Sequence, residues 1–148
     1  MNKELIDFIE SEAKKLGYTV LEVSLKGKGG LSADIVLDKE GGITLEECSA
    51  FNRMVSLWLD KSAFSAKGYT VDVASPGLDR VLKSDKDFIW ASGKNVRVAA
   101  SAPEGGTASY EGELKLSGDR TLTIAMKNGN IVELDRKNII KAQLSPEI

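Results

Sequence analysis

A proline-glycine pair near the middle of this 148-residue chain places the strongest constraint on how it can fold. The pair, Pro76-Gly77, follows the strand-like run 69–74 after one intervening residue, Ser75. Proline fixes φ near the value needed at the second position of a tight turn, and glycine tolerates the positive φ of the third position in a type II turn. We therefore predict that a strand ends here and that a type II turn, with Gly77 at positive φ, redirects the backbone toward a second domain.

Two amphipathic helices are predicted before this turn. Apolar residues recur at helical spacing over 2–16 and again over 44–60. Thr44 and Glu47 form a capping-box pattern that marks the start of the second helix. The buried face of that helix is predicted to carry Leu45, Cys48, Phe51, Val55 and Leu59.

Strands are predicted between the helices. Alternating residues indicate strands over 18–26 and 31–38, which the glycine-rich loop 27–30 would join as a hairpin. One face of the first strand would carry Thr19, Leu21, Val23 and Leu25. With the strand at 69–74, the order of elements is α-β-β-α-β. We expect a two-layer α/β domain with both helices on one face of a small sheet.

The pattern after the turn changes to a period of two. Ser84 and Asp87 show capping-box spacing, which predicts a short helix that ends near Gly93. Turn signals at Gly118-Asp119 and Asn128-Gly129 help to separate five predicted strands, over 94–100, 108–117, 120–127, 130–134 and 139–144. Five short strands favour a small closed or partly closed barrel, because closure removes exposed edges.

These patterns together predict an α+β protein with two domains. The N-terminal α/β domain is expected over 1–80 and the β-barrel domain over 94–148. A linker that contains the short helix is expected over 81–93. The apolar fraction of 42% is sufficient for packed cores in both domains.

The composition excludes several classes of function. The chain has no histidine and one cysteine, which excludes a Ser-His-Asp triad, a Cys-His pair and an ordinary zinc site. Cys48 cannot form an intramolecular disulfide, which fits a reducing compartment. No apolar run approaches the roughly 20 residues that span a bilayer, and the N-terminus has no signal-peptide core. We expect a cytoplasmic protein with no catalytic, cofactor or metal site and no membrane partner.

Charge differs slightly between the two halves. Residues 1–80 carry 10 basic and 13 acidic side chains, whereas residues 81–148 carry 10 and 9. Neither half is basic enough to wrap naked nucleic acid. The second half is the better candidate for contact with a polyanion.

The residues around the central turn resemble a known family signature. The strand at 69–74, followed by the run SPGLDR at 75–80, resembles the signature of the ribosome maturation factor RimP family. The resemblance covers essentially the whole chain. Asp72 stands where the family usually has glutamate, Ala74 where it has serine, and Val81 where it has proline. Without that proline, the junction is expected to be less stiff than in relatives.

The resemblance implies a fold and a function. It implies an N-terminal α/β domain followed by a small SH3-like or Sm-like β-barrel. Proteins of this family assist late assembly of the small ribosomal subunit and bind free subunits, with contacts to ribosomal RNA and to a small-subunit ribosomal protein. They have no catalytic activity and no cofactor, and we expect a monomer. A general Sm-like RNA-binding regulator, which would work as a ring, is the alternative.

Partner contacts are expected at the turn and at the start of the barrel. Asp79 and Arg80 have two interpretations, a local ion pair that stiffens the junction or a polar contact surface for a partner. The resemblance favours the contact surface. The candidate partner-binding residues are Ser75, Pro76, Gly77, Leu78, Asp79, Arg80, Lys94 and Arg97.

Overall fold

The chain divides into two compact units, Met1–Pro76 and Gly77–Ile148. The computed structural model describes residues 2–27, 29–116 and 120–145. The predicted Gly118-Asp119 turn and Lys28 of the predicted hairpin loop lie outside the described residues. No helix in the described part of the chain is long and apolar enough to cross a membrane.

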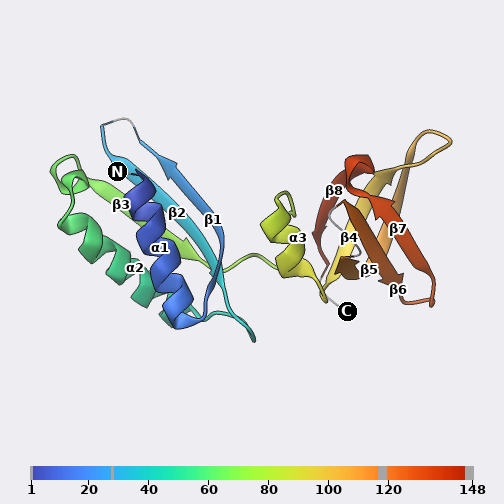
Figure 1. Ribbon diagram of the computed structural model, residues 1–148, viewed down its shortest axis with the longest axis horizontal. Coiled ribbons are helices and arrows are strands. Elements are labelled where there is room, and N and C mark those ends of the chain that lie inside the picture. Colours follow the sequence, from blue (N-terminus) through green and yellow to red (C-terminus); the bar gives the residue numbers. More distant parts are fainter. Residues whose placement is uncertain (1, 28, 117–119, 146–148) are drawn as a thin grey trace. The chain divides into compact units, whose positions relative to one another are not determined.

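The first unit has two helices on one face of a three-stranded sheet (Figure 1). The strand order is β1-β2-β3, with β1 antiparallel and β3 parallel to β2. The predicted α-β-β-α-β order is confirmed, with a short 3-10 helix, η1, before the last strand. The elements are α1 (Asn2–Leu16), β1 (Thr19–Lys26), β2 (Leu31–Asp38), α2 (Leu45–Asp60), η1 (Ala63–Ala66) and β3 (Tyr69–Ala74).

The core of the first unit lies between the helices and the sheet. Each helix buries a stripe of apolar side chains against the inner face of β2. The fully buried members of these stripes include Leu5 and Ile9 of α1, and Phe51 and Val55 of α2. Phe8 and Trp58 stack at the contact between α1 and α2, with ring centroids 5.4 Å apart. Helical spacing therefore predicted most of this core correctly.

Two details predicted for the first unit are wrong. Leu45 is 82% exposed, because it is the first residue of α2 and precedes the turn of the helix that packs on the sheet. In β1 a bulge shifts the register between Val20 and Glu22. A bulge adds one residue to a strand, so a strict alternation cannot continue across it. Thr19 is exposed, the adjacent Val20 and Leu21 are both buried, and the residues of β1 that pack in the core cluster are Val20, Val23 and Leu25.

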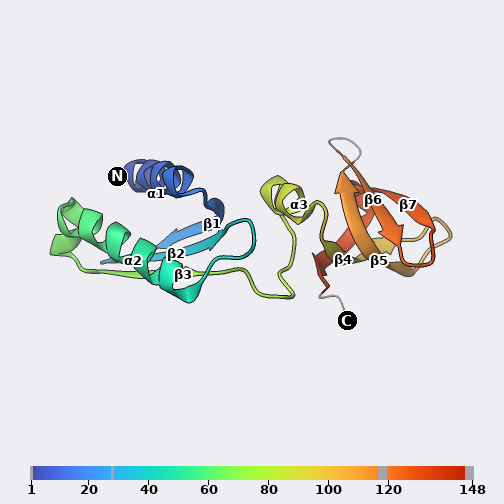
Figure 2. The ribbon, with the colours of Figure 1, turned by 90° about the horizontal axis from the view of Figure 1, so that it is seen from below.

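The second unit is a five-stranded antiparallel sheet packed with one short helix. The strand order is β7-β6-β5-β4-β8, and the strands are strongly twisted (Figure 2). The α+β class is thus confirmed. The elements are α3 (Asp85–Ala91), β4 (Asn95–Ser101), β5 (Thr107–Leu116), β6 (Thr121–Met126), β7 (Ile131–Asp135), the 3-10 helix η2 (Arg136–Asn138) and β8 (Ile139–Leu144).

The sheet of the second unit is not closed. Strands β7 and β8 stand at its two ends, and no pairing joins them among the described residues. The sheet nevertheless surrounds a single apolar core, to which α3 adds Phe88 and Ala91. The strands contribute the fully buried side chains Val96, Val98, Leu114, Leu122 and Ile124.

Candidate partner-binding site

The turn at the junction lies later in the chain than the sequence predicts. The backbone N–H of Arg80 donates to the carbonyl oxygen of Gly77 at 3.2 Å, so Leu78 and Asp79 form the centre of the turn. Gly77 is not among the glycines with positive φ, and no other residue type in the described part of the chain has positive φ. The predicted type II turn is therefore wrong. A type I turn accepts most residue types at its centre, so this turn does not require glycine there.

Arg80 forms a buried ion pair with Asp87 of α3. Its Nη2 lies 2.9 Å and its Nε 3.3 Å from Oδ1 of Asp87. The two side chains are only 13% and 5% exposed. The sequence suggests Asp79 as the ionic partner of Arg80, whereas in the structure this partner is Asp87 of the following helix.

Asp87 also holds the start of α3 in place. Its Oδ2 accepts the backbone N–H groups of Lys83 at 3.0 Å and Ser84 at 3.3 Å. The Ser84 hydroxyl accepts the N–H of Asp87 at 3.1 Å, which completes the predicted capping box. Burial raises the pKa of the Asp87 carboxyl, but the Lys83 N–H, the Arg80 guanidinium and the Ser84 N–H together hold it below its usual value. The carboxylate therefore stays ionised at neutral pH despite its burial.

Hydrogen bonds fix the segment after the turn to strand β8. The N–H of Leu144 donates to the carbonyl of Arg80 at 2.9 Å, and the N–H of Leu82 donates to the carbonyl of Ala142 at 2.7 Å. Val81 lies between them, in an antiparallel bridge with Gln143. Neither bond uses the N–H of Val81, so the attachment would also form with a proline at this position.

The anchored turn displays Leu78 beside a polar hollow. Leu78 is 78% exposed and its neighbour Asp79 is also exposed. A hollow of about 400 Å³ is lined by Leu78 together with Lys94, Asn95 and Glu113. The fold thus brings together two candidate residues, Leu78 and Lys94, that come from separate segments. An exposed apolar side chain with a polar rim is the usual composition of a protein interface.

Arg97 lies next to this hollow on β4. Its Nε and Nη2 lie 3.0 and 2.9 Å from Oε2 of Glu111, and both side chains are exposed. Ser145 also lines the hollow, and its hydroxyl donates to the same Glu111 oxygen at 2.8 Å. These hydrogen bonds, from Ser145 first and then Arg97, lower the pKa of Glu111. Ser75 and Pro76, in contrast, belong to the first unit, where Ser75 is exposed.

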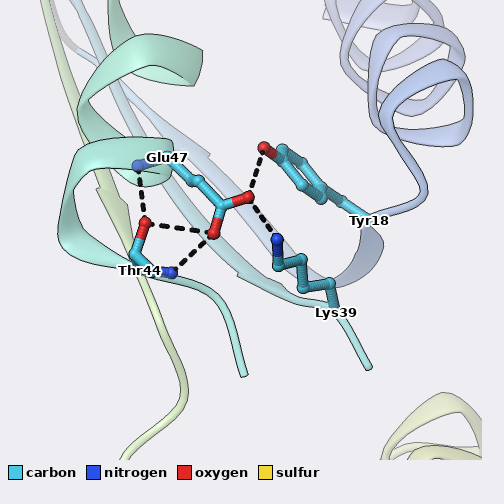
Figure 3. A network of polar contacts seen from close by, with 4 residues as sticks. All are labelled: Tyr18, Lys39, Thr44 and Glu47. Atoms are coloured by element: carbon cyan, nitrogen blue, oxygen red, sulfur yellow. Dashed lines mark hydrogen bonds and ion pairs between the residues drawn. The ribbon is translucent and has the colours of Figure 1, made fainter. Parts of the chain in front are cut away.

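A second polar network, in the first unit, surrounds Glu47 (Figure 3). Oε2 of Glu47 lies 2.5 Å from Lys39 Nζ and accepts the Tyr18 hydroxyl at 3.2 Å. Oε1 accepts the Thr44 N–H at 3.0 Å in the predicted capping box. The bond from Lys39, then that from the Thr44 N–H, lowers the pKa of Glu47 from 4.5 to about 2. These groups bond to one another, so we interpret the network as a structural link between α2, the end of β2 and the α1–β1 turn.

The Glu47 network does not form a metal-binding site. Among the residues that the structure describes, no group of three or more potential metal ligands lies close together.

Residues 8–79 match a known protein family, described as the RimP N-terminal domain.

The first unit belongs to the RimP family. The resemblance is thereby confirmed over residues 8–79, whereas its extension over the rest of the chain stays a prediction. RimP is a family of ribosome maturation factors and is not a family of enzymes. The RimP match includes Leu78 and ends at Asp79, so the Arg80–Asp87 pair lies just beyond it.

The Glu47 network makes the RimP N-terminal domain sensitive to acid. The pKa of Glu47 in the folded state is lower than in the unfolded state, so its stabilisation is complete above pH 4.5 and is lost as the pH falls to about 2. We expect Glu47→Gln to lower Tm at neutral pH and to make Tm less dependent on pH in that window. Thermal unfolding followed by circular dichroism measures both effects.

The matched control is Glu46→Gln, an exposed glutamate in the same helical turn. This control should follow the unmodified chain at every pH. If the Glu47→Gln curve instead runs parallel to that of the unmodified chain, the network does not stabilise the folded state.

Proposed function

We propose that this chain assists late assembly of the small ribosomal subunit by binding free small subunits. The match of residues 8–79 to the RimP N-terminal domain carries the proposal. The net charge of −2 supports it. A strongly basic protein binds RNA indiscriminately, whereas a factor that must leave a mature subunit needs modest affinity that depends on shape.

Ribosomal RNA and a small-subunit ribosomal protein are the proposed partners. The residues of the proposed site are those of the turn segment 75–80 together with Lys94 and Arg97. We assign Leu78 the apolar contact, because it is exposed on an anchored turn beside a polar hollow. Arg80 acts as a positioning residue, because its buried pair with Asp87 fixes the base of the turn.

The proposed mechanism is a holding step without catalysis or cofactor. The second unit and the junction would hold a partly assembled RNA–protein region until a ribosomal protein docks, and the chain would act as a cytoplasmic monomer.

An SH3-like barrel is the proposed class of the second unit. Five twisted antiparallel strands around one core support that class, although no pairing of β7 with β8 closes the sheet among the described residues.

Co-sedimentation with purified ribosomal particles tests this function. The chain is centrifuged through a sucrose cushion with free small subunits, with large subunits and with assembled ribosomes. We expect it in the pellet with free small subunits and in the supernatant with the other two. Equal binding to all three particles, or binding to none, would contradict the proposal. A solution mass of several chains would favour the Sm-like ring.

A further inference from the structure

A charged cavity of about 840 Å³ opens on the second unit, separate from the Leu78 hollow. The two share no lining residue. Three cationic side chains and two acids line the cavity: Arg120, Arg136, Lys137, Asp85 and Asp135.

The register of β6 and β7 brings the cations together. Thr121 pairs with Asp135, and the N–H of Arg136 donates to the carbonyl of Arg120 at 2.8 Å. Lys137 follows in η2, whose start Asp135 caps. The three positive charges are therefore held at one end of a strand pair.

The acids neutralise two of the three cations. Arg136 forms an ion pair with Asp85, and Lys137 Nζ lies 3.9 Å from Oδ2 of Asp135. Arg120 is exposed and adds one positive charge in excess. The cavity therefore favours an anionic ligand.

One wall of the cavity is apolar. Ile89 is 64% exposed there, and Leu116 is also exposed beside the buried Leu122 and Phe88. The guanidinium carbon of Arg136 lies over the Phe88 ring, 4.4 Å from its centroid. Cations beside an exposed apolar surface suit a ligand that carries both an anionic group and a flat apolar group.

We propose that this cavity binds a short stretch of single-stranded RNA. Arg120 and Lys137 contact phosphates, and a base packs against Ile89 and Leu116. A nucleotide supplies both an anionic group for the cations and an apolar surface for the aliphatic wall, and contacts to phosphates do not select a base sequence. An acidic peptide would engage the cations but would leave the apolar wall exposed.

Fluorescence anisotropy of a labelled short oligouridylate, titrated with the full chain, tests the site. Lys137→Glu and Arg120→Glu should each weaken binding by about tenfold, and each should lower the slope of log affinity against log salt by about 0.7. Ile89→Ser should weaken binding while leaving the salt slope unchanged, because it removes an apolar contact and no charge.

Lys141→Glu is the matched control, because Lys141 is exposed on β8 outside the cavity and the change in charge is the same. It should bind the RNA within about twofold of the unmodified chain. The proposal is overturned if the unmodified chain does not bind the RNA, if Lys141→Glu weakens binding as much as Lys137→Glu, or if oligoglutamate binds as tightly. Circular dichroism checks that each variant is folded, and Arg120→Gln replaces Arg120→Glu if that variant is not.

Discussion

Alanine at Asp87 is expected to lower the free energy of unfolding of the second unit by about 3–5 kcal/mol. The side chains of Asp87 and Arg80 are almost entirely buried, so Asp87→Ala leaves a cation in a poorly solvated place. It also removes the acceptor of two backbone N–H groups at the start of α3. The loss of these two helix-capping bonds adds to the loss of stability.

Urea unfolding followed by the fluorescence of Trp90 measures this effect in a Trp58→Phe background, because Trp90 belongs to the second unit. Asp79→Ala is the control, an exposed acid on the same turn that should change stability by less than about 0.5 kcal/mol. A loss below about 1 kcal/mol for Asp87→Ala would show that solvent screens the pair as it screens a surface ion pair.

Arg80→Lys is expected to retain only part of the stability that the Arg80–Asp87 pair gives to the second unit. Lysine is a point charge and cannot reproduce the two bonds that Nε and Nη2 of Arg80 direct at one oxygen. The stabilisation by Asp87 should also fade as the pH falls below the usual value of an aspartate, because its pKa is lowered in the folded state.

The elements of both units could be predicted because their signals are local. The capping boxes at Thr44 and Ser84 are both present, and each depends on residues within one helical turn. The Asn128-Gly129 signal also holds, because Gly129 has positive φ between β6 and β7. Helical spacing identified the cores of α1 and α2 for the same reason.

The details that the sequence did not predict depend on contacts between segments. Pro76-Gly77 is a turn signal wherever it occurs, and it does not say whether the turn is centred on the pair or follows it. The ion pair of Arg80 depends on how α3 packs, although Asp87 already carried a signal as a capping residue. The Leu78–Lys94 hollow depends on the attachment of residues 80–82 to β8. The β1 bulge likewise arises from strand pairing, which periodicity does not record.

Leu78→Asp is expected to weaken binding to free small subunits by about 30-fold or more, the range of an interface hot spot. The exposed leucine would lose its apolar contact, and the new carboxylate would lie beside Glu113 of the same hollow. The turn itself is fixed by the Arg80–Asp87 pair and by backbone bonds to β8, so thermal unfolding should not change. Loss of binding without loss of fold would separate the contact role of Leu78 from the positioning role of Arg80.

The most direct test is the dissociation constant for purified free small subunits, measured for the unmodified chain, Leu78→Asp and Leu45→Asp. Leu45 is the matched control, because it is an equally exposed leucine on α2 of the first unit. The account predicts that the unmodified chain and Leu45→Asp bind with constants within about threefold of each other, and that Leu78→Asp binds at least about 30-fold more weakly. Equal binding by all three folded chains, or no binding by the unmodified chain, would contradict it.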